Sequence, residues 1–79
     1  MGGAEKLIQK IFARRQVSYK EAEKILFELG YQLKINGSHH VFRKFGCRHV
    51  TLKRRPYLLL YQIIDLQEAL RENGYEEKI

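Results

Sequence analysis

This chain of 79 residues has no tryptophan, one cysteine, one proline and no long apolar run. Cys47 is the single cysteine, so neither an internal disulfide nor a cysteine-based metal cage can form. No apolar run approaches the roughly 20 residues that a membrane-spanning helix needs, and the first residues lack the apolar segment of a secretory signal. We therefore expect a single domain over residues 1–79, in a reducing cytoplasm and away from membranes.

Acidic residues are absent from the middle of the chain. None of the nine Asp and Glu residues lies between residues 29 and 64, whereas seven of the 15 Lys and Arg residues do. This window therefore carries the whole excess behind the formal net charge of +6. A local positive field attracts polyanions, and nucleic acid is the leading candidate. A solvated basic surface that only favours solubility is the alternative.

Apolar residues at helical spacing predict three helices. The first covers residues 4–14. Ser18 and Glu21 have the spacing of a capping box, which predicts a second helix over residues 19–29 that stops at Gly30. A last helix is predicted from about residue 58 to residue 73, followed by Gly74. Its residues expected to face largely inward are Leu59, Leu60, Ile63, Ile64, Leu66 and Leu70.

Three short strands are predicted between the second and last helices. Residues 31–36 alternate between apolar and polar side chains. The pair Asn36-Gly37 is typical of a type I′ hairpin turn, so residues 38–43 should fold back as a second strand. Residues 49–53 form the third. The order α-α-β-β-β-α predicts an α+β fold, with a three-stranded antiparallel sheet whose helices pack on one face and leave the other open.

The predicted turn separates the two adjacent histidines. A two-residue loop at Asn36-Gly37 pairs Ile35 with Ser38 and Lys34 with His39. Because neighbouring strand residues point to opposite faces, His40 then joins the apolar face, and His39 joins the open face beside Lys34.

The third strand fits the same assignment of faces. A five-residue loop before it keeps Val50 and Leu52 on the apolar face and sets His39 opposite Lys53. A four-residue loop would reverse these faces and leave polar residues inside. The open face is then predicted to carry Lys34, His39, Arg43, His49, Thr51 and Lys53.

Each histidine receives a different interpretation. His39, an imidazole between lysines on a basic face, is the candidate general acid or base. His40 is interpreted as a structural residue at the core edge. His49 is interpreted as an exposed residue that contacts phosphate, and it is also the weaker candidate for a second acid–base group. A metal site is not expected, because the window of residues 29–64 has no carboxylate. Tyr57 and Tyr61 are predicted to pack in the core, with base stacking as the alternative.

Several segments resemble the HicA family of toxins, which are mRNA interferases paired with HicB antitoxins. The similar segments are "LGYQLK" at residues 29–34, "GSHHVFR" at 37–43, "HVTL" at 49–52 and the closing helix through residue 74. The resemblance covers about residues 19–74, and the helix at 4–14 is an addition to the family pattern. It implies a fold like a double-stranded-RNA-binding domain, and a catalytic histidine directly after Gly-Ser, which is His39 here.

The resemblance also implies an activity and partners. These are metal-independent cleavage of mRNA by an endoribonuclease without a cofactor, and inhibition by a HicB-type antitoxin. Many members continue the third strand into a Pro-His segment, whereas this chain reads "TLKRRP", so phosphate contacts are expected from the basic residues there. The expected RNA-binding residues are Lys34, Gly37, Ser38, Arg43, His49, Lys53, Arg54 and Arg55.

The sequence is also compatible with two other functions. One is a non-catalytic RNA-binding module on the same fold, and the other is a protein-binding domain whose basic face docks an acidic partner.

Overall fold

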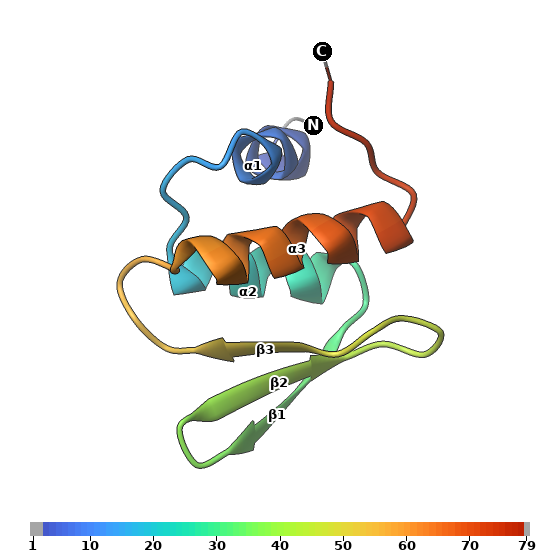
Figure 1. Cartoon of the computed structure of the whole chain (residues 1–79). Coiled ribbons are helices and arrows are strands. Elements are labelled where there is room, and N and C mark those ends of the chain that lie inside the picture. The colour runs from blue at the N-terminus through green and yellow to red at the C-terminus, as the bar shows by residue number, and fades with distance from the viewer. Residues whose placement is uncertain (1–2, 79) are drawn as a thin grey trace.

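The fold is an α+β arrangement with the predicted order of elements (Figure 1). The computed structural model describes residues 3–78. Its three strands form one antiparallel sheet in the order β1-β2-β3. The elements are α1 (Gly3–Phe12), α2 (Tyr19–Glu28), β1 (Gln32–Asn36), β2 (His39–Arg43), β3 (Val50–Lys53) and α3 (Leu60–Glu72).

The helices form two layers on one side of the sheet. In Figure 1, α2 and α3 lie between the sheet and α1, and no element of residues 3–78 covers the opposite face of the sheet, which we call the bare face. Helix α1 contacts α2 and α3, whereas α3 also contacts β3. The prediction of helices packed on the sheet therefore holds for α2 and α3, while α1 packs on those helices instead. The largest fully buried side chains between the layers are Ile11, Ile25, Leu26, Phe42, Leu52, Leu66 and Leu70.

The start of α2 is fixed by the predicted capping box. The Ser18 hydroxyl accepts a hydrogen bond from the backbone N–H of Glu21 (3.1 Å), and the Glu21 carboxylate accepts one from the N–H of Ser18 (3.0 Å). Nζ of Lys10 also donates to this carboxylate at 2.9 Å, which connects α1 to α2. One local motif thus positions both the helix and its neighbour.

The β1–β2 turn lies one residue later in the chain than predicted. Asn36 pairs with His39 and Ile35 with His40, so Gly37 and Ser38 are the two loop residues. Gly37 has a φ of 64°, and Ser38 is not among the residues with positive φ. A positive φ at the first central position alone is the type II′ pattern with glycine first. The expected Asn36-Gly37 loop is therefore wrong, and the second strand begins at His39 rather than Ser38.

The assignment of residues to faces survives this correction. Moving the turn by one residue on both strands changes the partners but keeps the same side chains on each face. The predicted register between β2 and β3 is confirmed, with His39 opposite Lys53 and Phe42 opposite Val50. Ile35 shares the helix-facing side with His40, yet it is 59% exposed.

The beginning of α3 also differs from the prediction. The helix starts at Leu60, two residues later than expected, and Leu59 and Leu60 are exposed rather than inward. Helix α3 also buries two polar residues, Gln62 and Gln67. The Oε1 of Gln62 accepts a hydrogen bond from the N–H of Leu59 (3.0 Å), and Nε2 of Gln67 donates to the carbonyl oxygen of Phe12 at the end of α1 (3.2 Å).

Candidate nucleic-acid interface

The two adjacent histidines have opposite environments. His39 is exposed on the bare face of the sheet. His40 lies on the helix side, where its Nδ1 is hydrogen-bonded to the hydroxyl of Tyr19 at 2.5 Å. The rings of Tyr19 and His40 meet edge to face, with 5.2 Å between their centroids. His40 is thus tied into the fold, as predicted for a structural residue, whereas His39 is accessible to a ligand.

His39 lies in a cross-strand row with Asn36 on β1 and Lys53 on β3. Residues directly opposite in an antiparallel sheet have Cβ atoms about 4.5–5.5 Å apart, so Lys53 is a close neighbour of the imidazole. Lys34 is opposite Val41 and is therefore a diagonal neighbour of His39, not the direct partner that was expected. Asn36 takes that place, which sequence reasoning missed because it put Asn36 inside the turn.

The connection from β3 to α3 adds further cations at this end of the sheet. We call this end, made by Asn36–His39 and Lys53, the hairpin end. Arg54 and Arg55 follow Lys53 and are exposed. The guanidinium carbon of Arg54 lies 6.0 Å from the centroid of the Tyr19 ring, a cation–π arrangement. An open cleft between this connection and the start of α2 is lined by Ser18, Tyr19, Lys20, Arg54, Arg55 and Pro56.

Tyr19 is the buried residue under the hairpin end. Its side chain is only 4% exposed, and its hydroxyl lies 3.4 Å from Oε2 of Glu23 in addition to the bond with His40. Burial, followed by the nearby negative charge of Glu23, raises the pKa of Tyr19 to about 12. The phenol therefore stays protonated at any physiological pH and remains available for hydrogen bonding.

Arg43 and His49 lie at the other end of the sheet. Arg43 is four residues from His39 along β2, and His49 is four residues from Lys53 along the third strand segment. Four strand residues span about 13 Å, so neither side chain joins His39 at one reacting phosphate. His49, considered as a second acid–base group, is thus not brought to His39. Both residues remain on the exposed face.

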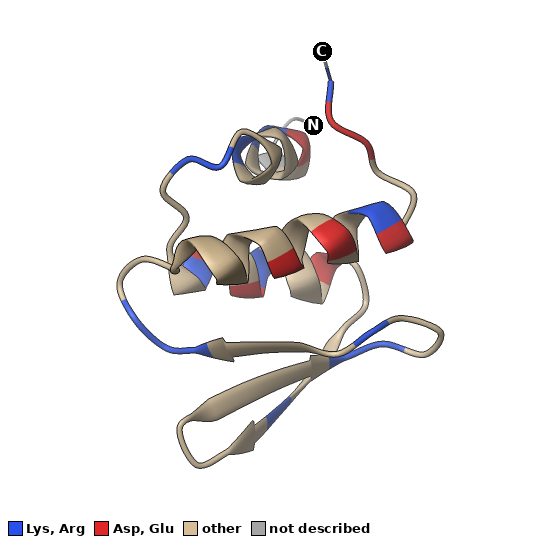
Figure 2. Ribbon diagram, viewed as in Figure 1, with Lys and Arg blue, Asp and Glu red and all other residues tan. Residues whose placement is uncertain are grey.

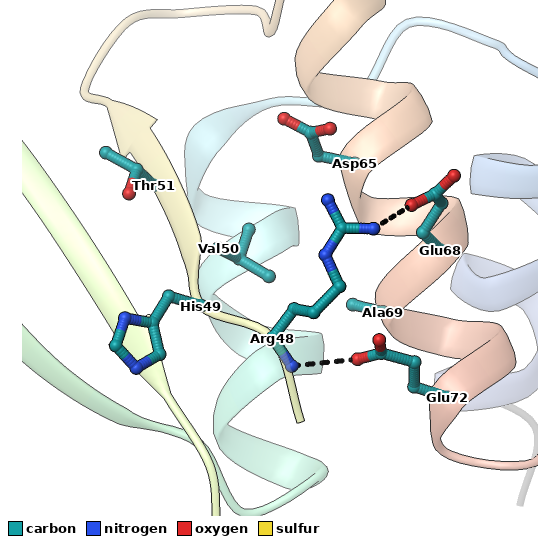
Figure 3. A pocket seen from close by; sticks show the side chains of 8 residues that line it. All are labelled: Arg48, His49, Val50, Thr51, Asp65, Glu68, Ala69 and Glu72. Carbon is teal, nitrogen blue, oxygen red and sulfur yellow. Dashed lines mark hydrogen bonds and ion pairs between the residues drawn. The ribbon is translucent and has the colours of Figure 1, made fainter. Parts of the chain in front are cut away.

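A separate cleft lies between β3 and α3 (Figure 3). Arg48 points into it toward α3, whereas His49 points away. Nη1 of Arg48 is 2.6 Å from Oε1 of Glu68, and its backbone N–H donates to Oε1 of Glu72 at 3.0 Å. Asp65 also lines the cleft. These carboxylates neutralise Arg48 and make the cleft unsuitable for a polyanion, so Arg48 belongs to the scaffold.

Charge is segregated between the two sides of the molecule (Figure 2). The acidic residues lie on the helices and the C-terminal segment, whereas the sheet and its connections carry only basic ones. Lys44 also turns to the helices, where Nζ donates to Oδ1 of Asn73 and lies over the Tyr31 ring. Within residues 3–78, only Arg48 of the seven cations in the central window has an acidic partner. Apart from Lys44, which is held by Asn73, the cations left without one are Lys34, Arg43, Lys53, Arg54 and Arg55.

The described residues contain neither a metal-binding cluster nor a membrane-spanning helix. Within residues 3–78, no three His, Cys, Asp or Glu side chains are grouped to hold a metal ion. In the same part of the chain, no helix combines the length and the apolar character that crossing a membrane requires.

Comparisons with known proteins found no family model, no curated protein and no solved structure that matches the chain.

Proposed function

We propose that the chain is a metal-independent endoribonuclease, the mRNA-cleaving toxin of a type II toxin–antitoxin system of the HicA kind. The observation that carries the proposal is the exposed His39 between Asn36 and Lys53 on a bare basic face. The adjacent His40 is engaged by Tyr19 and leaves His39 as the free imidazole of the pair. The toxin acts on cytoplasmic mRNA and is inhibited by a HicB-type antitoxin.

The likeness to a double-stranded-RNA-binding domain is part of the same proposal. Helix α2, the three strands and α3 have the required order, with α1 as an addition behind them. The bare sheet face with its unpaired cations is the surface that we assign to RNA.

The reaction uses the nucleophile that RNA itself carries. His39 removes the proton of a 2′-hydroxyl, and the 2′-oxygen attacks the adjacent phosphorus. The bond from phosphorus to the 5′-oxygen breaks as that oxygen takes up a proton from solvent water, and the protonated His39 releases its proton to solvent. The products are a 2′,3′-cyclic phosphate and a 5′-hydroxyl end. No metal-bound water is needed, and residues 29–64 contain none of the carboxylates that Mg²⁺ prefers as ligands.

The cations have separate roles in this scheme. Lys53, opposite His39, stabilises the negative charge that develops on the phosphorane. Lys34, Arg54 and Arg55 bind neighbouring phosphates. The Gly37-Ser38 turn offers its backbone to phosphate, since even an added Cβ at Gly37 would meet no atom within 4 Å. Arg43 and His49 bind the RNA backbone farther along the sheet.

Cleavage in the presence of a chelator tests the proposal. The purified chain is incubated with single-stranded RNA in excess EDTA, and the ends of the products are identified by mass spectrometry. We expect fragments with 2′,3′-cyclic phosphate and 5′-hydroxyl ends, and none with the His39→Ala variant. RNA that is bound but intact would instead support the non-catalytic binding module, and absence of binding at moderate salt would support the protein-binding domain.

A further inference from the structure

Two tyrosines next to the hairpin end are exposed, against the prediction that they pack in the core. Tyr57 is 53% exposed and Tyr61 is 57% exposed. Tyr57 precedes α3, and Tyr61 lies in its first turn. Leu59 and Leu60, between them, are exposed as well, so an aromatic and apolar surface covers the beginning of α3.

This surface is held by a fixed backbone. Leu58 is buried, and its backbone N–H donates to the carbonyl oxygen of Val17 at 2.8 Å. The N–H of Leu59 is bound by the buried Gln62 side chain. These two anchors fix the backbone between Tyr57 and Tyr61, directly after Tyr57. Exposed rings on an anchored backbone lose little conformational freedom when a ligand packs on them.

The surface also follows the candidate catalytic row closely along the chain, at the same end of the sheet. Lys53 is opposite His39, and Tyr57 follows Lys53 by four residues, so their Cα atoms are at most about 14 Å apart. Arg54 and Arg55 lie between them and, with Lys20, line the cleft described above. Exposed aromatic rings beside cations that lack acidic partners match a ligand that has flat apolar rings on an anionic backbone.

We propose that Tyr57 and Tyr61 form a stacking subsite for unpaired nucleobases of single-stranded RNA, next to the phosphate at His39. The inference rests on the proposed function and names its substrate class. Nucleobases stack on aromatic side chains while nearby cations hold the phosphates. In a duplex the faces of the bases are stacked on one another, so only unpaired nucleotides fit this subsite.

The test uses a short single-stranded 2′-O-methyl RNA, which keeps bases and phosphates but lacks the free 2′-hydroxyl nucleophile. Binding is followed by the fluorescence anisotropy of a dye attached to the RNA, a signal that does not depend on the tyrosines removed in the variants. Quenching of tyrosine fluorescence is recorded in parallel, because the chain has no tryptophan. We expect the RNA to quench the fluorescence of the wild type. Tyr57→Ala and Tyr61→Ala should each weaken binding by about 5- to 150-fold, the loss of one stacked base. The double variant should bind the RNA more weakly than either single variant.

Three controls make the result specific. Tyr57→Phe and Tyr61→Phe keep the rings and should bind as the wild type does. Tyr75→Ala removes a ring that is 39% exposed beyond the other end of α3, and it should not change binding. A probe with abasic nucleotides lacks the bases, while the protein keeps both tyrosines. The wild type should bind this probe as weakly as the double variant binds the unmodified probe.

The outcomes separate this inference from the proposed function. Unchanged binding by the double alanine variant, or unchanged binding of the abasic probe, overturns the subsite and leaves the apolar surface to a protein partner. RNA binding that depends on Tyr57 and Tyr61, without cleavage of ordinary RNA, upholds the subsite and rejects the nuclease. Absence of RNA binding by the wild type overturns both.

Discussion

The hydroxyl of Tyr19 lies 2.5 Å from Nδ1 of His40, across the boundary between α2 and the sheet. His40 directly follows His39 in β2, so this bond holds the strand backbone next to the exposed side chain of His39. Phe42, farther along the strand, packs at 6.4 Å between ring centroids against the same tyrosine. A buried phenol thus supports the orientation of the candidate catalytic residue from the opposite face of the sheet.

Tyr19→Phe should lower stability at neutral pH and change its dependence on alkaline pH. Loss of the hydrogen bond to His40 should cost about 0.5–1.5 kcal/mol. The pKa of Tyr19 is raised by burial from 10.0 to about 12 in the folded chain, so its contribution is complete below about pH 10 and is lost as pH rises toward 12. The phenylalanine variant lacks this loss. Urea unfolding of both proteins is measured at pH 8 and near pH 11, about the middle of that interval. The difference between their free energies of unfolding should be smaller near pH 11. An unchanged difference would contradict the raised pKa of Tyr19.

Glu21 should contribute stability that disappears in acid. Hydrogen bonds from Nζ of Lys10 and from the N–H of Ser18 lower the pKa of Glu21 below its usual 4.5. Its charged form is favoured by folding, so the contribution is present above the unfolded pKa and is lost as pH falls through the lower folded value. We expect thermal unfolding of Glu21→Gln to change less between neutral and acid pH than that of the wild type. Glu28→Gln, on the same helix, is the matched control and should follow the wild type.

The salt dependence of RNA binding should distinguish the basic face from the scaffold cations. If Lys53 contacts a phosphate, Lys53→Gln should reduce the slope of log K against log salt by about 0.7–0.9 and weaken binding of 2′-O-methyl RNA. Arg48→Gln removes the same charge from the cleft where Glu68 neutralises it, so binding and slope should stay as in the wild type. If the two substitutions changed RNA affinity and its salt dependence equally, binding would depend only on the net charge of the chain.

Local motifs made much of the fold predictable from the sequence. The capping box at Ser18 fixed the start of α2, and Gly30, with a φ of 96°, follows its last turn. The separation of His39 and His40 was predictable because alternation of side chains is a property of every strand, whichever residues form the turn. The turn itself was not, because Asn36-Gly37 and Gly37-Ser38 both match hairpin signals and preserve the same faces.

Features that depend on distant residues were not predictable. Gln67 is buried because it donates to backbone carbonyls at the end of α1, 55 residues away in the sequence. Tyr57 and Tyr61 were placed in the core on helical spacing, yet α3 begins only at Leu60, so the spacing does not apply to Tyr57. The Tyr19 bond to His40 likewise joins two elements whose relative position no local pattern specifies.

The initial rate of RNA cleavage in His39→Ala and His49→Ala tests the central claim most directly. Both histidines are exposed on the same face of the sheet, so each substitution removes one imidazole without disturbing the core. We predict that His39→Ala loses about 10²- to 10⁴-fold in rate, as expected for a general acid–base group, while His49→Ala loses far less. A His39→Ala protein that cleaves RNA as fast as the wild type would contradict the account.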